Sequence, residues 1–236
     1  MRELKLRPVA ADPAITEANE KHAKSLGLRK LEFPLGPHRY KLAVVGGGPS
    51  ILRKWDEIRE FDCVLAINST HKTLKRFGID STFVTVDPDP VIAEFAKGAT
   101  SAIVATRCAP EVFEALKSAD VRWFDLSEVR MGTATASTCI DLGVKMGFRK
   151  IVFFGCECSF NGPSHADRNE DRASMVVHAD GRDWITAPDL YLQAQELSAA
   201  IRANPVFGER SGGMLRAMVH DKNFKATKMR ESCLSS

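Results

Sequence analysis

Residues 41–50 read KLAVVGGGPS, an apolar run that ends abruptly in three glycines and a proline. The first five residues have the composition of a buried β-strand, and the proline has a fixed φ that suits the first turn of a helix. The segment therefore predicts a strand, a tight turn and a helix that runs to about residue 61. This is the opening unit of an alternating α/β domain, which we expect to begin at residue 40.

The same alternation continues along the chain. Residues 151–154 read IVFF, and such continuous apolar strands are typical of a parallel sheet that is buried on both faces. The sequence predicts a Rossmann-like, three-layer α/β domain with a mostly parallel sheet and helices on both faces. We expect the further strands at 63–67, 82–86, 102–105, 121–124 and 150–154, and the helices at 70–77, 91–97, 110–117 and 136–146.

Three other segments complete the expected organisation. Residues 1–39 are polar, contain four prolines and one helical stretch at about 14–27, and predict an arm that packs on the domain or on a partner. The polar stretch 156–186 predicts a lid with a hairpin within 175–186. A long helix at 190–202, an edge strand near 205–207 and a short helix after residue 213 follow. The domain ends near residue 220, and residues 221–236 form a basic, flexible tail.

Composition limits the class of protein. The 236 residues fit one large α/β domain, and the net charge of +3 gives no strong indication of an anionic partner. The chain opens with MRELK rather than a secretory signal, and no apolar run reaches the roughly 18 to 20 residues of a membrane span. Most of the six cysteines lie in apolar runs, where a thiol packs as a small hydrophobe. We therefore expect a cytoplasmic protein with reduced thiols.

The glycine turn is the first candidate for ligand binding. Ligands of open α/β sheets sit at the carboxyl ends of the strands, where a helix start offers backbone N–H groups to an anion. The turn consists of Gly46, Gly47, Gly48, Pro49 and Ser50, and its spacing matches neither the dinucleotide fingerprint nor the P-loop. We expect it to bind a nucleotide. The alternative is a tight strand-to-helix turn without a ligand.

Polar residues also follow the second and third predicted strands. Asn68 could hydrogen-bond a base or ribose, with Ser69 beside it, whereas the simpler role here is a helix cap. Asp87 and Asp89 could share a divalent metal ion that bridges a diphosphate, because such ions prefer hard oxygen ligands. The alternative for Asp89 is a cap on the following helix.

The remaining candidates lie later in the chain. Thr133 and Thr135 precede a helix, which they could cap, or they could face the ligand. Glu157 follows the last central strand, where a carboxylate could hold a ribose hydroxyl pair or act as a base. His165 and His178, in the expected lid, are candidate general bases. The cysteines at 156 and 158 do not have the spacing of a zinc site.

Several of these motifs occur together in a known family. VVGGGPS at 44–50, AINS at 66–69, VTVDP at 84–88 and MGFRKIVFFGCE at 146–157 occur in that order. They resemble the family that includes archaeal 6-hydroxymethyl-dihydropterin pyrophosphokinases and motility-accessory-factor flagellin glycosyltransferases. More distantly, they are similar to bacterial sialyltransferases that use CMP-sialic acid.

The resemblance implies a nucleotide on the glycine turn, on Asn68 and on Thr135, with Asp87 as a metal candidate. The chain also departs from its relatives. Glu157 stands where the family usually has Asp, and Gly47 stands where the sialyltransferases have Asn. The sialyltransferases also lack the Asp87 carboxylate. These departures argue against sialic acid transfer and leave nucleotide binding intact.

Three functional hypotheses follow. The first is a glycosyltransferase that uses a nucleotide sugar, of the CMP-linked or a similar type. The second is a pyrophosphokinase that transfers a diphosphate from ATP with Mg²⁺ to a small hydroxymethyl substrate. The third is a non-catalytic nucleotide-binding or assembly protein. The base, the acceptor and the oligomeric state stay open, so a nucleic-acid acceptor and a homo-oligomer are both retained as alternatives.

Overall fold

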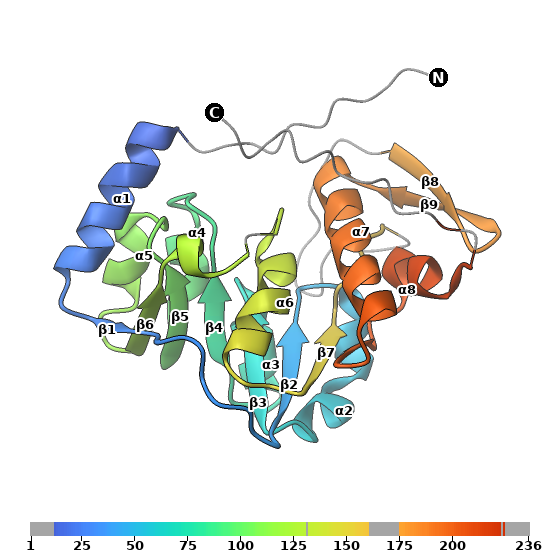
Figure 1. The fold of residues 1–236 in the computed structure, drawn as a ribbon, viewed down its shortest axis with the longest axis horizontal. Helices are drawn as coiled ribbons and strands as arrows, with labels where there is room; N and C mark the ends of the chain where they lie inside the picture. The colour runs from blue at the N-terminus through green and yellow to red at the C-terminus, as the bar shows by residue number, and fades with distance from the viewer. Residues whose placement is uncertain (1–11, 131, 161–174, 223, 225–236) are drawn as a thin grey trace.

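The computed structural model describes residues 12–130, 132–160, 175–222 and 224. An eight-stranded sheet with only parallel pairs forms the centre of the molecule, in the order β1-β6-β5-β4-β3-β2-β7-β10 (Figure 1). Its strands are β1 (Arg29–Lys30), β2 (Lys41–Val45), β3 (Cys63–Ile67), β4 (Thr82–Thr85), β5 (Ser101–Ala105), β6 (Asp120–Phe124), β7 (Lys150–Phe154) and β10 (Phe207–Glu209).

Helices cover both faces of this sheet. Alternate residues of β2 enter two hydrophobic clusters: Leu42 and Val44 pack with Leu142 of α6, whereas Ala43 and Val45 pack with residues of η1, α2 and α3. The predicted three-layer α/β fold is thereby confirmed. The helices are α1 (Pro13–Ser25), η1 (Pro49–Arg53), α2 (Trp55–Arg59), α3 (Thr70–Arg76), α4 (Ile92–Ala96), α5 (Pro110–Ala115), η2 (Leu126–Glu128), α6 (Thr135–Lys145), α7 (Pro188–Ala203) and α8 (Gly213–His220).

The strand order reverses beside β2. The chain adds β3, β4, β5 and β6 outward on one side of β2, then returns to place β7 on its other side. In open α/β sheets, such a reversal leaves a crevice at the carboxyl ends of the two strands, where ligands bind. The turns that follow β2 and β7, at 46–50 and 155–157, meet at this point.

The segment before β2 is part of the domain surface. Its β1 adds a strand beside β6, and the indole N–H of Trp123 donates to the carbonyl of Leu28 at 3.0 Å. An ion pair of 2.8 Å between Lys24 and Asp125 fixes α1. The described part of the arm, residues 12–39, therefore packs on the domain. Sequence patterns missed β1 because two basic residues give no strand periodicity.

The predicted helix from Pro49 to about residue 61 is wrong in one respect. It is divided into the 3₁₀ segment η1 and the α-helix α2, because Lys54 between them has φ −120° and ψ 4°, outside the helical region. No described helix is both long and apolar enough to cross a membrane.

The expected hairpin in the lid is present. Strands β8 (Met175–Ala179) and β9 (Arg182–Thr186) pair antiparallel, apart from the main sheet, at the right of Figure 1. The buried Trp184 packs there with Met214 and Met218 of α8. Residues 161–174 of the predicted lid and nearly all of the predicted tail lie outside the described residues.

Candidate functional site

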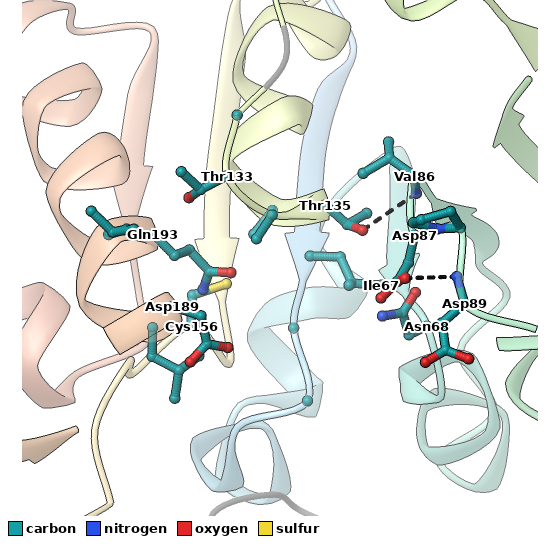
Figure 2. A pocket seen from close by; sticks show the side chains of 18 of the residues that line it. Ile67, Asn68, Val86, Asp87, Asp89, Thr133, Thr135, Cys156, Asp189 and Gln193 are labelled. Atoms are coloured by element: carbon teal, nitrogen blue, oxygen red, sulfur yellow. Dashed lines mark hydrogen bonds between the residues drawn. The ribbon is translucent and has the colours of Figure 1, made fainter. Parts of the chain in front are cut away.

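A cleft of about 1060 Å³ lies at the carboxyl edge of the sheet. The ends of β2, β3, β4, β5 and β7 form its floor, and the first turns of α6 and α7 form one wall (Figure 2). Its volume lies at the upper limit of the usual range for small-molecule sites, so it has room for a nucleotide and a second substrate. The predicted residues that line it are Gly46, Gly47, Gly48, Pro49, Asn68, Asp87, Asp89, Thr133, Thr135 and Glu157.

The glycine turn after β2 lies against the turn after β7. The N–H groups of Gly46 and Gly48 donate to the carbonyls of Phe154 and Gly155, at 2.8 and 2.9 Å. A Cβ atom on Gly48 would lie 1.7 Å from a carboxylate oxygen of Glu157, and one on Gly46 would lie 2.6 Å from the carbonyl oxygen of Gly155. The glycines are therefore required for the close approach of the two turns, whether or not a ligand binds.

Glu157 occupies the position at which an anionic ligand was expected. Its Oε1 accepts a hydrogen bond from the backbone N–H of Ser50 at 2.6 Å. A protein carboxylate thus satisfies the start of η1, which is only five residues long. Ser50 does not line the cleft. A phosphate could use this N–H group only after Glu157 moves.

Asn68 is the most distinctive residue of the floor. It has φ +49°, in the left-handed region that few residues other than glycine adopt, and its amide oxygen Oδ1 is buried with no hydrogen-bond partner among the described residues. Strained backbone and unsatisfied polar atoms are both concentrated at ligand sites. The neighbouring Ser69 is the N-cap of α3 without a side-chain capping bond, and it lies outside the lining.

The two aspartates after β4 have different surroundings. Asp87 Oδ1 accepts from the N–H of Asp89 at 3.0 Å, whereas Asp89 Oδ1 accepts from the N–H of Val91 at 2.9 Å. Figure 2 shows the Asp89 carboxylate directed away from that of Asp87, which lies on the same side of the cleft as Asn68. Asp89 thus stabilises the turn before α4, the alternative role considered for it. Both aspartates line the cleft, and of the two carboxylates that of Asp87 lies beside Asn68 in this view.

The first turn of α6 faces the cleft, but neither predicted threonine caps it. The N-cap is Ala134, and its N–H donates to the Ser137 hydroxyl at 3.1 Å. The hydroxyl of Thr135 is buried and accepts from the N–H of Val86 at 3.4 Å. Thr133 instead donates to Glu196 of α7. Because Ala134 has no side-chain acceptor, no N-cap side chain satisfies the N–H groups at the start of this 11-residue helix, and Thr135 and Ala136 of its first turn line the cleft.

Neither histidine that was predicted to be a general base is among the described residues of the cleft lining. His178 lies on the outer side of the hairpin, its side chain is 69% exposed, and its Nδ1 lies 2.9 Å from Asp183. It is not part of the cleft lining. His165 lies outside the described residues. Of the residues predicted to be catalytic, Glu157 alone is both described and in contact with the cleft.

The cysteines after β7 are not arranged as metal ligands. The thiols of Cys156 and Cys158 donate to the carbonyls of Phe154 and Cys156, and burial raises the pKa of Cys158 to about 12. Both thiols are therefore protonated at neutral pH. Within the described ranges, no group of three or more His, Cys, Asp or Glu residues is placed to hold a metal ion.

Two further walls of the cleft were not predicted. Asp12, Ile15 and Asn19 of the α1 segment form one, and residues 188–193 of α7 contribute to the opposite one. The Asn19 side chain is buried and donates to the carbonyl of Arg107 at 2.9 Å, which fixes α1 against the end of β5. No local pattern marks such residues, because only the tertiary fold brings these helices to the strand ends.

The described lining of the cleft is predominantly acidic. Its described lining contains one basic residue, Arg107. The acidic residues are Asp12, Asp87, Asp89, Glu111, Glu157 and Asp189. A polyanionic ligand would be repelled from such a site unless a cation accompanied it.

Comparisons with known proteins agree with this architecture. The solved structure of the MAf glycosyltransferase from Magnetospirillum magneticum AMB-1 superposes with a TM-score of 0.65 at 14% sequence identity. The match covers 92% of this chain but only 39% of that protein, so it shows the shared fold. No curated protein sequence matches the chain.

A family model described as "6-hydroxymethylpterin diphosphokinase MptE-like" matches residues 19–163, which is more than half of the chain. Diphosphokinases are transferases, so the family match supports that broad class. The family resemblance seen in the strand-end motifs is confirmed. The chain belongs to the MptE-like family.

Proposed function

We propose that this protein is a nucleotide-dependent transferase that moves a diphosphoryl group from a Mg²⁺-bound nucleotide, such as ATP, to the hydroxyl group of a small acceptor. The observation that carries the proposal is the charge of the cleft, six carboxylates against one arginine in its described lining. A triphosphate enters such a site favourably only with a divalent cation, because metal coordination neutralises its charge. Membership of a family named for a diphosphokinase supports the same chemistry.

The residues at the ends of β3 and β4 fit a divalent cation. Asp87 supplies a carboxylate, and the buried Oδ1 of Asn68 supplies an oxygen that has no partner in the described part of the chain. Hard oxygen donors of these two kinds are typical Mg²⁺ ligands. The bound cation would neutralise the charge that develops on the phosphates. Asp89 is less suitable, because it is exposed and stabilises the turn before α4.

In this proposal the first turn of α6 binds the phosphates of the donor nucleotide. Its N–H groups have no acceptor one turn earlier in the helix, and the helix dipole favours an anion there. Thr135 and Ala136 bring this turn to the cleft. In this proposal the first turn of α6 replaces the glycine turn as the main phosphate contact, because the N–H of Ser50 already donates to Glu157.

Glu157 is the best placed base. In the proposed reaction the acceptor oxygen attacks the β-phosphorus of ATP, and the bond from that phosphorus to the oxygen that bridges it to the α-phosphorus breaks. AMP leaves, and the acceptor proton passes to a carboxylate. Glu157 lines the cleft beside the glycine turn, where its Oε1 accepts from Ser50 and its Oε2 is buried. Its carboxylate would take the proton after it turns from this position towards the acceptor.

Glycosyl transfer from a nucleotide sugar is the second candidate. The fold shared with the MAf glycosyltransferase covers 92% of the chain, whereas the family model ends at residue 163, before the hairpin, α7 and α8. One wall of the cleft comes from α7, so part of the candidate site lies in the portion that only the structural match includes. In this alternative the donor is a CMP-linked or related sugar, and Asp87 need not hold a metal ion.

Nucleotide binding and product identity test both candidates. Thermal shifts would be recorded with CMP, CDP, UDP, GDP, ADP and ATP, each with and without Mg²⁺; a ligand at about 100 times its Kd stabilises by about 2.7 kcal/mol. Diphosphoryl transfer predicts a Mg²⁺-dependent response to ATP, and release of AMP when 6-hydroxymethylpterin is added. A metal-independent response to CMP would favour glycosyl transfer. No response to any nucleotide would refute both, and would favour a non-catalytic protein.

A further inference from the structure

One carboxylate joins the two halves of the cleft wall. Glu196 of α7 accepts from the backbone N–H of Thr133 through both of its oxygens, at 3.0 and 3.2 Å, and from the Thr133 hydroxyl at 2.8 Å. Thr133 lines the cleft, and so does Gln193, one helical turn before Glu196. Glu196 itself does not line the cleft. It connects the segment before α6 to the helix that forms the adjoining wall.

This connection matters because α6 has a weak cap of its own. The N-cap Ala134 has extended backbone angles, φ −144° and ψ 168°, and no side-chain oxygen. On the helix side, the Thr138 hydroxyl accepts from the N–H of Gly132 at 3.1 Å, and the Ser137 hydroxyl accepts from Ala134. The contact of this segment with α7 is the hydrogen bonding of Thr133 to Glu196, which is 63 residues away in sequence. Hydrogen bonds to a charged acceptor are stronger than those between neutral groups.

We propose that Glu196 is a positioning residue that fixes the first turn of α6 at the distance from α7 that the donor phosphates require. The inference rests on the proposed function for the identity of the ligand. Its structural part, that Glu196 orders residues 132–136, stands independently. Glu196 lies beyond residue 163, where the family model ends, whereas its partner Thr133 lies inside the matched region.

Two substitutions of Glu196 distinguish the effect of its hydrogen bonds to Thr133 from the effect of its negative charge. Glu196→Ala removes the hydrogen bonds and the charge. Glu196→Gln removes the charge but keeps an oxygen for the N–H of Thr133, and its amide can donate to the Thr133 hydroxyl. A positioning role predicts that Kd for Mg²⁺-ATP rises about tenfold in Glu196→Ala and stays within about threefold in Glu196→Gln. If the negative charge near the helix start mattered most, both variants would bind Mg²⁺-ATP more tightly.

A double-mutant cycle with Thr133→Val tests whether Glu196 acts through its hydrogen bonds to Thr133. Because Glu196 acts through Thr133, the double variant Glu196→Ala/Thr133→Val should bind Mg²⁺-ATP no more weakly than Glu196→Ala alone. Glu114→Ala is the control: this exposed carboxylate on α5 pairs with Lys117 and lies outside the cleft lining. Isothermal titration with Mg²⁺-ATP measures all six proteins: wild type, the single variants Glu196→Ala, Glu196→Gln, Thr133→Val and Glu114→Ala, and the double variant. Binding by Glu196→Ala that equals wild type would overturn the proposal.

A second measurement keeps this inference distinct from the proposed function. Amide hydrogen exchange of residues 132–136 is measured without any ligand, and we expect it to be about tenfold faster in Glu196→Ala than in wild type or Glu114→Ala. If wild type binds no nucleotide while exchange rises, the proposed function fails and the ordering by Glu196 stands. If exchange is unchanged, the inference about Glu196 is wrong whatever the binding result.

Discussion

The carboxylate of Glu157 accepts the backbone N–H of Ser50 at 2.6 Å, across the point where the sheet reverses its strand order. The contact joins two turns that are more than a hundred residues apart in sequence. It places a negative charge over the glycines, so the site presents a hydrogen-bond acceptor where the sequence indicated donors.

Replacement of Glu157 should separate catalysis from folding. Glu157→Gln keeps an oxygen for Ser50 and should retain most of the stability, whereas transfer should fall about 10²- to 10⁴-fold, as is typical when a general base is lost. The cleft residue Glu111, changed to Gln, is the matched control and should have a small effect. Urea unfolding and AMP release measure the two properties. Full transfer by Glu157→Gln would exclude Glu157 as the base.

Gly48→Ala tests the close approach of the two turns. Its Cβ would lie 1.7 Å from Glu157 Oε2 and 2.7 Å from the carbonyl oxygen of Gly155, so we expect the free energy of unfolding to fall by about 2 kcal/mol or more. Gly36→Ala is the control, because its added Cβ meets nothing within 4 Å. Urea denaturation compares the two. Equal stability of both variants would show that the turns can separate freely.

Asp87 and Asp89 should respond differently to removal of charge. Asp87→Asn should abolish most of the Mg²⁺-dependent part of ATP binding, because a neutral amide is a weaker ligand than a carboxylate for this cation. Asp89→Asn should bind nearly as wild type, since Asn also caps turns. Titrations of ATP with and without Mg²⁺ give the comparison. An equal loss in both variants would instead indicate a metal ion shared by the two aspartates.

The free energy of unfolding should fall in acid because His71 is buried in its neutral form. This histidine is 6% exposed and packs on Phe83, and burial, reinforced by Lys72 and Lys75, lowers its pKa to about 4. Since the unfolded chain binds this proton near pH 6.5, stability contributed by neutral His71 is complete above that pH. It is lost as the pH falls from about 6.5 to about 4, by on the order of 3 kcal/mol. His71→Leu should flatten this part of the profile of unfolding free energy against pH, and an unchanged profile would contradict the assignment.

The sequence predicted the parts of the molecule that local patterns encode. Strands such as 151–154 and helices closed by glycine, such as that ending before Gly78, have a periodicity and a boundary that single residues mark. The strand-end positions Asn68, Asp87 and Glu157 followed from the rule for parallel sheets, and all three line one cleft. Their chemical roles stay predictions.

Other features depend on contacts that no local pattern contains. The role of Ile15 in the lining, the anchor from Glu196 to Thr133 and the bond from Glu157 to Ser50 each join segments far apart in sequence. His178 was expected near the ligand because it lies in the predicted lid, yet the alternation of β8 turns its side chain outward. In a strand, a shift of one residue exchanges the two faces.

The position of β10 has a consequence for the integrity of the chain. This strand of three residues pairs with β7, whose residues 151–154 are almost entirely buried, and it is the outermost strand on that side of the sheet. Without it, the most apolar strand of the protein would become an open edge with unpaired N–H and C=O groups, a template for intermolecular pairing. Proteolytic removal of residues 205–220 should therefore leave the remaining domain with an unpaired apolar edge and make it prone to aggregate.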